Sequence, residues 1–379
     1  MILRHFLLLL FCGIACAAWS QVKQEEKSAE ISPLPMSIDS TKVTYKNKIL
    51  AFPLIALSTE TSWVFGAGGA YIFKTSKKDL SLRTSTMPLL LLYTLKDQIL
   101  AGIGANIFLP KEKYIIRFEN TYSRFPDKFW GIGNDTPANA EESYTFTQFF
   151  INPAISRKIH RNLFAGLGIE YQHVFNIKYD SGGNFEKDQV VGIYNRSEYD
   201  VFGLSALITY DSRNHAYTPN KGALFRVRFS NFNQSRGSDY NFQSLDIDYR
   251  KFIQLKPRRI LALQYYGLMT FGEVPYRNLA QLGGSMMMRG YYQGRYRDKM
   301  IMSAQAEYRF PVVWRFGAVA FASAGQVADN MSQFNFSRMH YAAGAGVRFS
   351  VLPSENFNLR VDAAYGDRWN VYVLLTESF

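Results

Sequence analysis

The sequence predicts an all-β fold, namely a sixteen-stranded antiparallel transmembrane β-barrel. First, apolar and polar residues alternate with a period of two along most of the chain, which is typical of strands. Second, the aromatic content is 16%, with 24 Tyr and 30 Phe, as in the aromatic girdles of membrane barrels. Third, the polar faces of the strands are rich in glycine, which favours a barrel around a lumen over a soluble sandwich.

The N-terminus predicts export. Arg4 and His5 precede an apolar run over 6–18, which is a charged segment followed by a short hydrophobic one. The run is shorter than the about 20 apolar residues that a transmembrane helix needs. We therefore expect residues 1–20 to form a signal peptide that is cleaved at the end of this range. A lipoprotein box around Cys16 is the alternative, although the glycine at its first position is unusual.

The rest of the chain divides into two parts. Both cysteines, Cys12 and Cys16, lie in the expected signal peptide, so the mature protein has no thiol for a disulfide, a zinc site or a nucleophile. Residues 21–48 are polar and contain two prolines, which predicts a periplasmic linker. Residues 49–379 carry the alternating strands and are expected to form an outer-membrane barrel, in which apolar side chains meet lipid and polar ones line the lumen.

The strands can be placed one by one. In one of them, Ile116 and Phe118 oppose Arg117 and Glu119. The sixteen strands are expected at 50–59, 62–74, 80–94, 98–109, 113–125, 143–157, 162–177, 197–211, 222–232, 240–254, 258–273, 300–310, 314–326, 338–351, 356–366 and 368–379.

The connections between these strands are of two kinds. The longer ones, 126–142, 178–196 and 274–299, all fall at one end of the barrel, and several short basic turns fall at the other. Long extracellular loops and short periplasmic turns are typical of outer-membrane barrels.

A glycine-rich segment with an arginine stands directly before a strand that has one polar and one apolar face. The segment reads LGGSMMMRGYYQGRYRD at 282–298, and QAEYRFP follows at 305–311. This pairing resembles the loop-and-strand signature of the BamA/TamA superfamily of outer-membrane barrels (the bacterial surface antigen family). The resemblance covers the whole barrel. It implies that the sixth extracellular loop, 274–299, folds inward into the lumen and docks on a charged residue of the wall.

Within this signature, Arg289 is the residue that would dock, together with Gly290 and Tyr291. The planar guanidinium group offers several donors to a carboxylate, and a buried charge without a partner is costly. Glu307 is in phase with the polar face of its strand and is the expected partner. In the superfamily an Asp on the next strand often stands two residues before a Gly. Ser323 occupies that place here, so Glu307 is the stronger candidate.

The same loop contains Gly283 and Gly284, which are expected to adopt positive φ and to fit a crowded lumen. The alternative to an active role is that Arg289 and Glu307 only stiffen a plug.

A second string, at 210–222, resembles the Asp-x-Arg…Pro-x-x-Gly periplasmic turn of the superfamily. It contains Asp211, Arg213, Pro219 and Gly222. Proline and glycine fix a chain reversal, and an aspartate caps its own backbone. Simple turn formation is therefore the favoured interpretation.

The expected last strand, 368–379, places Val371 and Leu375 in one phase with the terminal Phe379. A terminal aromatic residue resembles the signal that the assembly machinery reads in outer-membrane proteins. Glu377 interrupts this apolar phase, so the match is partial.

The resemblance implies an assembly or translocation factor that assists insertion or transport of proteins or lipids at the outer membrane. Residues 21–48 are too short for a POTRA domain, the periplasmic module usual in the superfamily, so a reduced form is expected. The expected partners are outer-membrane lipids including lipopolysaccharide, client outer-membrane proteins, and periplasmic or lipoprotein subunits. The alternatives are a passive pore or structural barrel with a plug loop, and an outer-membrane lipase.

Enzymatic chemistry is not expected. No two histidines have metal-ligand spacing and no nucleophile elbow or phosphate loop appears, so no catalytic residue, metal or cofactor is predicted. His173 and Ser205 are weak candidates for a lipase site. The net charge of +12 is spread over turns and alternate strand positions, which favours anionic lipid headgroups and disfavours nucleic acid.

Overall fold

The computed structural model describes residues 47–379, with short gaps at 59–61, 77–78, 80–81, 96, 216–217, 353–356, 376 and 378. The expected signal peptide and nearly all of the expected linker lie outside the described residues. No helix in the described part of the chain is both long and apolar enough to cross a membrane.

The described chain is almost entirely β-structure, with a main sheet of seventeen strands and a separate pair. The main sheet comprises β1 (Lys48–Ser58), β2 (Ser62–Phe73), β3 (Ser85–Thr94), β4 (Ile99–Phe108), β5 (Tyr114–Phe129), β6 (Glu142–Ile151), β7 (Ala154–His160), β8 (Leu163–Tyr179), β9 (Glu198–Asp211), β10 (Gly222–Phe232), β11 (Phe242–Lys256), β12 (Arg259–Gly272), β15 (Met300–Val313), β16 (Phe316–Ala328), β17 (His340–Leu352), β18 (Phe357–Tyr365) and β19 (Trp369–Leu375). The pair is β13 (Ala280–Leu282) with β14 (Tyr296–Asp298).

Helical structure is confined to short segments in the connections. These are α2 (Asn184–Lys187) and the 3-10 turns η1 (Pro110–Glu112), η2 (Ala138–Ala140), η3 (Gln234–Arg236), η4 (Tyr276–Asn278), η5 (Met331–Gln333) and η6 (Phe336–Arg338).

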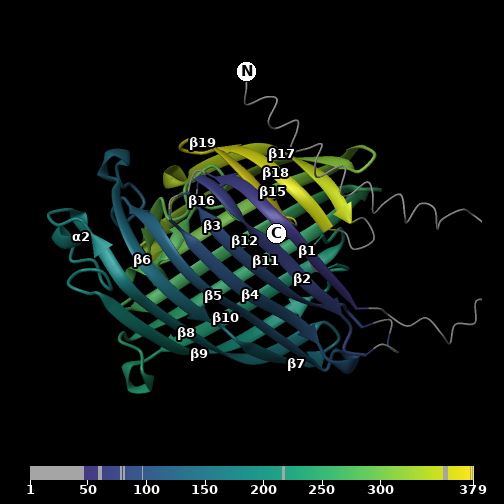
Figure 1. Ribbon diagram of the computed structural model, residues 1–379, viewed down its shortest axis with the longest axis horizontal. Helices are drawn as coiled ribbons and strands as arrows, with labels where there is room; N and C mark the ends of the chain where they lie inside the picture. The colour runs from purple at the N-terminus through teal and green to yellow at the C-terminus, as the bar shows by residue number, and fades with distance from the viewer. Residues whose placement is uncertain are drawn as a thin grey trace, which may run out of the picture. The chain divides into compact units, whose positions relative to one another are not determined.

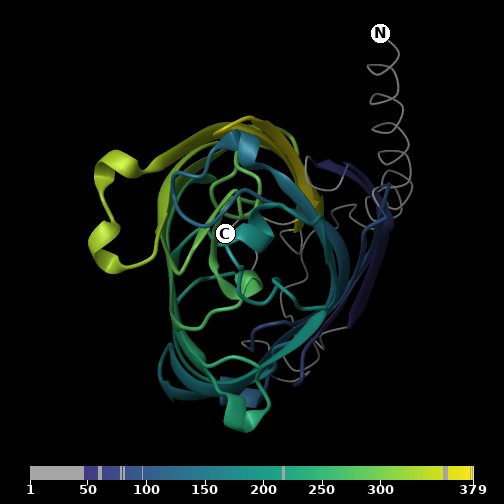
Figure 2. The ribbon, with the colours of Figure 1, turned by 90° about the vertical axis from the view of Figure 1, so that its left-hand side faces the viewer.

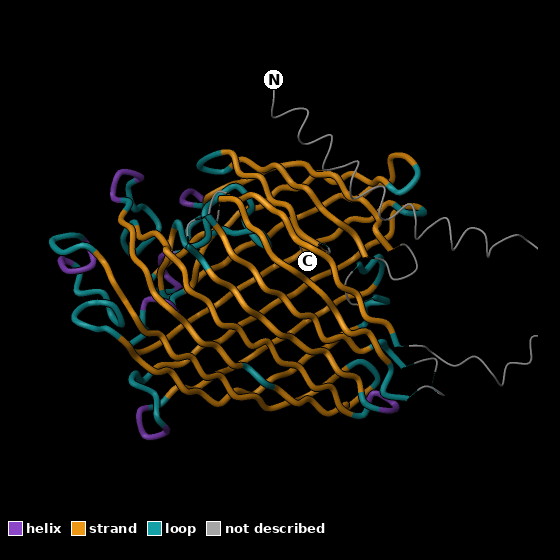
Figure 3. The backbone as a smooth tube through the Cα atoms, viewed as in Figure 1, coloured by secondary structure: helices purple, strands orange, loops and turns teal. Residues whose placement is uncertain are grey.

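The strands follow one another around the sheet in chain order and neighbours are antiparallel, except that β6 and β7 lie end to end between β5 and β8. The pairing runs from β1 with β2 to β18 with β19, and β12 pairs directly with β15. β1 and β19, the two ends of this series, lie next to each other, so the sheet closes on itself (Figure 1, Figure 2). The strands run obliquely round the wall (Figure 3), as closure of a barrel requires.

The two ends of the barrel differ. We call the end with the connections β5–β6, β8–β9, β12–β15 and β16–β17 the loop end, and the opposite end the turn end. Figure 2 looks onto the loop end, where α2 and neighbouring loops cross the mouth. The three connections predicted to be long all lie at the loop end, whereas the turn end has short turns together with two longer connections, β2–β3 and β9–β10.

The predicted strands agree with the observed ones in order and place, but some ends differ. The strand expected at 80–94 begins at Ser85. The strand expected at 143–157 is divided into β6 and β7 at Asn152-Pro153, because proline has no N–H for the ladder. Both β6 and β7 pair with β5 and β8, so the sheet has seventeen strands where sixteen were predicted.

The two faces of the wall follow the sequence alternation. On β9, Leu204, Ile208 and Tyr210 are 47%, 52% and 41% exposed on the outer face, whereas Ser205 and Thr209 are buried inside. Large apolar side chains outside and hydroxyls inside reverse the order of a soluble core, as expected when lipid surrounds the wall.

A hydrophobic cluster fills the interior at the loop end. It joins inward-facing strand residues such as Phe129 and Val201 to Phe185 of α2 and Tyr276 of η4. The ring of Phe129 stacks on Phe185 at 4.1 Å and meets Tyr276 edge-on at 5.2 Å. The start of the β12–β15 connection is thereby held inside the wall.

Replacing Leu204 with Arg should destabilise the folded barrel, because its side chain is exposed on the apolar outer face. An arginine facing lipid near the bilayer midplane costs about 2–4 kcal/mol. Thr121→Arg is the matched control, since Thr121 lines the internal cavity, where a new charge should cost less than it does against lipid. Urea unfolding in lipid vesicles would give both free energies of unfolding. Equal losses would contradict the assignment of the outer face to lipid.

Candidate functional site

The β12–β15 connection is a folded loop with a paired base. β13 and β14 align Ala280 with Asp298 and Leu282 with Tyr296. Above this base the chain turns at Gly283 (φ 109°) and again at Gly290 (φ 115°). A Cβ atom at Gly283 would lie 2.1 Å from the carbonyl oxygen of Tyr292, so only glycine fits there.

The same constraint applies at the tip of the loop. A Cβ atom at Gly290 would lie 2.6 Å from the carbonyl carbon of Tyr365, at the end of β18. The Gly290 amide donates to the Tyr372 hydroxyl at 3.2 Å, and its carbonyl accepts from Asn370 at 2.9 Å. The tip is therefore packed directly against β18 and β19.

Arg289 lies between two carboxylates from different strands. Its Nη2 is 2.7 Å from Glu307 on β15, and its Nη1 is 2.6 Å from Asp362 on β18. None of the three side chains has exposed surface. The guanidinium carbon also lies 3.4 Å from the ring centroid of Phe321 on β16, where a cation is stabilised by the ring face.

Three further arginines surround these carboxylates. Arg309 contacts Glu307 at 2.8 Å, while Arg348 and Arg360 both contact Asp362. Arg360 also donates to the carbonyl oxygen of Ser285 in the loop at 2.8 Å. The buried cluster therefore connects the loop with β15, β17 and β18.

Asp362 was not predicted from the sequence. The place of the family's Asp on β16 is occupied by Ser323, whose side chain makes only a 3.5 Å hydrogen bond to the Ala342 carbonyl. Asp362 stands two strands further on and alternates with Arg360 on the inner face of β18. The sequence does show that Asp362 belongs to the polar face of its alternating strand. The alternation does not reveal, however, which strand approaches Arg289.

Tyr291 adds a neutral hydrogen bond at the tip. Its hydroxyl donates to the Tyr341 carbonyl at 3.0 Å. Burial raises the pKa of the Tyr291 phenol to about 12, so the group stays protonated as a donor.

A second ion cluster holds the base of the loop, and sequence reasoning missed it. Asp127 at the end of β5 contacts Arg277 at 2.7 Å and Arg297 at 3.0 Å, and it accepts from the hydroxyls of Tyr144 and Tyr292. The loop is thus fixed by carboxylates at both base and tip. Gly284, which stands between the base and the tip of the loop, has a positive φ of 110°.

The predicted turn residues form a turn at the turn end. Asp211 accepts from the backbone amide of Arg213 at 3.2 Å and from its Nε at 2.9 Å. Pro219 is buried, and Gly222 begins β10. Asp211 also accepts from Arg83 of the β2–β3 connection at 3.0 Å, a contact that the sequence did not predict.

The position expected for Phe379 was wrong. β19 ends at Leu375, and Phe379 is buried inside the barrel beside Phe252, with its carbonyl oxygen accepting from Arg309 at 2.9 Å. Glu377 gives the physical reason. Its carboxylate pairs with Arg348 at 2.7 Å, and a charge held by an interior arginine cannot face lipid.

Comparison with known protein families identifies the superfamily. A profile of the Omp85 superfamily domain matches residues 75–365. The chain belongs to the Omp85 superfamily. As an Omp85 barrel it is an integral protein of the outer membrane, and the predicted BamA/TamA relationship is confirmed. No curated protein matches the chain in sequence.

Solved structures share the fold of this Omp85 barrel. BamA from Haemophilus ducreyi lacking POTRA domains 1-3 is 14% identical, with a TM-score of 0.60, and the alignment covers 87% of this chain and 70% of that one. CdiB from Acinetobacter baumannii is 13% identical with a TM-score of 0.55, covering 87% and 59%. CdiB from Escherichia coli is 10% identical with a TM-score of 0.59, covering 87% and 62%. This chain therefore spans less than two thirds of either CdiB.

Arg289→Ala should lower the free energy of unfolding by about 3 kcal/mol, the lower end for a broken buried ion pair. The loop would lose its contacts to β15 and β18, while Arg309 and Arg348 would still neutralise the carboxylates. Semi-native gels over a temperature series would measure the loss. Arg338→Ala is the control, because Arg338 pairs with Asp135 on the exposed surface. A temperature shift no larger than that of the control would contradict the docking role of Arg289.

Proposed function

We propose that this Omp85 chain assists the insertion or transport of proteins or lipids at the outer membrane. The observation that carries the proposal is the position of Arg289, which joins the β12–β15 connection to β15 and β18 at once. β18 pairs with β19, and β19 meets β1. The docked loop is therefore linked to the part of the wall where the first and last strands meet.

That junction is the place where the wall could open. Separation of β1 from β19 would present two strand edges, and an exposed edge is a template for pairing with another strand. Contacts of the loop with Tyr372 and Asn370 on β19 would oppose such a movement. Release of Arg289 would then favour opening towards a client strand or lipid.

The proposed architecture follows the same contacts. We count β6 and β7 as one membrane span interrupted at Asn152-Pro153, because both pair with the same neighbours; this gives sixteen spans. The loop at 274–299 would act as an inward-folded plug. In this division residues 1–20 are the signal peptide, 21–48 the periplasmic linker and 49–379 the barrel.

The proposed partners are those of an assembly factor. Outer-membrane lipids, including lipopolysaccharide, would surround the apolar outer face. Client outer-membrane proteins would be the substrates, with periplasmic or lipoprotein subunits as helpers. Nothing in the proposed mechanism requires an enzyme reaction.

A plugged pore is the second candidate, and the internal cavity of about 940 Å³ favours it. The cavity is lined by charged and other polar side chains as well as apolar ones, so ions could cross the barrel once the loop moved. In this alternative the Arg289 contacts only keep the plug in place, and no client would fold faster.

Reconstitution of the full chain in liposomes separates these candidates. We expect a small client barrel to fold faster in vesicles that contain the protein, and we expect Arg289→Ala to change that acceleration at least twofold. Arg338→Ala should behave as wild type, because its ion pair lies on the exposed surface. No acceleration together with ion conductance in the same vesicles would favour the pore instead.

A further inference from the structure

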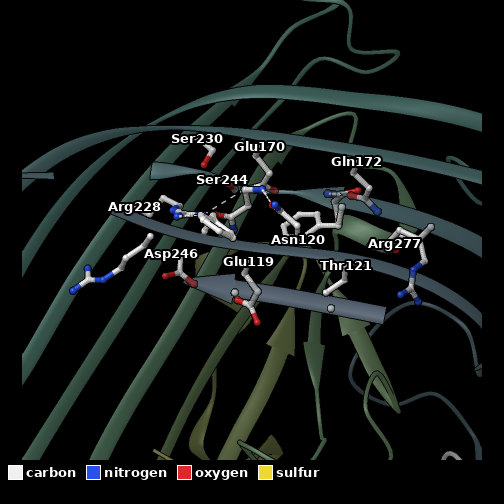
Figure 4. A pocket seen from close by; sticks show the side chains of 18 of the residues that line it. Glu119, Asn120, Thr121, Glu170, Gln172, Arg228, Ser230, Ser244, Asp246 and Arg277 are labelled. Atoms are coloured by element: carbon white, nitrogen blue, oxygen red, sulfur yellow. Dashed lines mark hydrogen bonds and ion pairs between the residues drawn. The ribbon is translucent and has the colours of Figure 1, made fainter. Parts of the chain in front are cut away.

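The internal cavity lies between β4, β5, β8, β10 and β11, adjacent to the loop-end cluster. Figure 4 shows acidic, basic and amide side chains projecting towards it. Polar walls are expected around water, but the charges on these walls are not equally neutralised.

Arg117 on β5 is the exception among the arginines of the cavity. It lines the cavity and makes no hydrogen bond or ion pair with any residue in the described ranges. Arg226 and Arg228 on β10, by contrast, contact Asp248 at 3.2 Å and Glu170 at 3.7 Å. An arginine held inside a barrel without a counter-ion is costly, so its environment requires an explanation.

The surroundings of Arg117 are predominantly cationic. The charges that act on it most strongly are one carboxylate, Asp211, and three guanidinium groups, Arg226, Arg83 and Arg213. Asp211 is already shared, since Arg83 lies 3.0 Å and Arg213 2.9 Å from its oxygens. Asp211, the carboxylate that acts most strongly on Arg117, is therefore engaged elsewhere.

Two of the acidic residues of the cavity serve other arginines. Glu170 faces Arg228, and Asp246 faces Arg226 at 4.0 Å. Glu119 lies two residues from Arg117 on the same strand, but within the described residues it forms no ion pair with Arg117 or with any other arginine. The carboxylates of the cavity are therefore concentrated beside Arg226 and Arg228, and none of them contacts Arg117.

A second hydrogen-bond donor without a partner lines the same cavity. The Ser230 side chain is fully buried, its Oγ has no hydrogen-bond partner, and it lines the cavity two residues beyond Arg228 on β10 (Figure 4). Buried hydroxyl groups are normally hydrogen-bonded. The cavity thus offers a free guanidinium group on β5 and a free hydroxyl group on β10.

We propose that the barrel lumen binds a phosphate-type oxyanion between Arg117 and Arg226. Guanidinium forks match the oxygen atoms of phosphate, and a bound anion would supply the countercharge that the protein lacks. The phosphate group belongs either to a small solute or to a lipid headgroup, since both present the same oxygens. This inference does not rest on the proposed assembly function.

Thermal unfolding of the full-length folded protein in a neutral detergent tests the site. At constant ionic strength, replacing chloride by inorganic phosphate should raise the unfolding temperature in a saturable way, because a ligand of the native state stabilises it. Arg117→Gln should lose this response. In chloride alone it should unfold at a higher temperature than wild type, because the unpaired charge has been removed.

Arg157→Gln is the matched control. Arg157 lies on neighbouring β7, is exposed, and aligns with Tyr114 three residues before Arg117. The substitution removes a positive charge at a similar height but on the outer side of the wall. The response of this variant to phosphate should therefore equal that of wild type.

A parallel titration with short-chain phosphatidic acid identifies the source of the phosphate. Stabilisation by phosphatidic acid but not by inorganic phosphate, lost in Arg117→Gln, would support the site with a lipid ligand. Stabilisation by inorganic phosphate with the same loss would support a solute. The proposal is overturned if neither probe stabilises wild type, or if Arg117→Gln responds as wild type does.

Discussion

The rest of the interior depends on one ionic contact, the placement of Arg289 between Glu307 and Asp362. A guanidinium group without exposed surface needs anions at hydrogen-bonding distance, and these two come from strands that are separated by β16 and β17. The contact therefore sets how deeply the loop enters and where its tip lies. The close approach of the tip to β18 in turn requires glycine at Gly290.

The membrane imposes the second constraint. Lipid cannot satisfy backbone polar groups, so the sheet must close, and its outer face must be apolar. The polar residues are then confined to the inside, where repeated sharing of carboxylates neutralises the arginines. Each of four aspartates contacts two or more guanidinium groups: Asp127 with Arg277 and Arg297, Asp211 with Arg83 and Arg213, Asp248 with Arg226 and Arg250, and Asp362 with Arg289, Arg348 and Arg360.

This sharing has consequences at both ends of the barrel. At the loop end, Asp127 fixes the base of the plug-like loop beside the aromatic cluster. At the turn end, Asp211 serves two arginines and leaves Arg117 without a counter-ion. Near β19, Glu377 extends the Arg289 cluster and carries the last residues inward, so that Phe379 packs on Phe252.

The sequence by itself determined the class of fold, the order of the strands and the family. A period of two fixes which side chains share a face of a strand, and that information is local. It also indicated Arg289, Glu307 and the turn at Asp211, because these residues lie in strings that resemble the superfamily. Only the tertiary structure decided that Asp362 completes the Arg289 site, that Arg83 reaches Asp211, and that Phe379 turns inward. Each of these contacts joins residues far apart in the chain, and closure of the barrel alone brings them together.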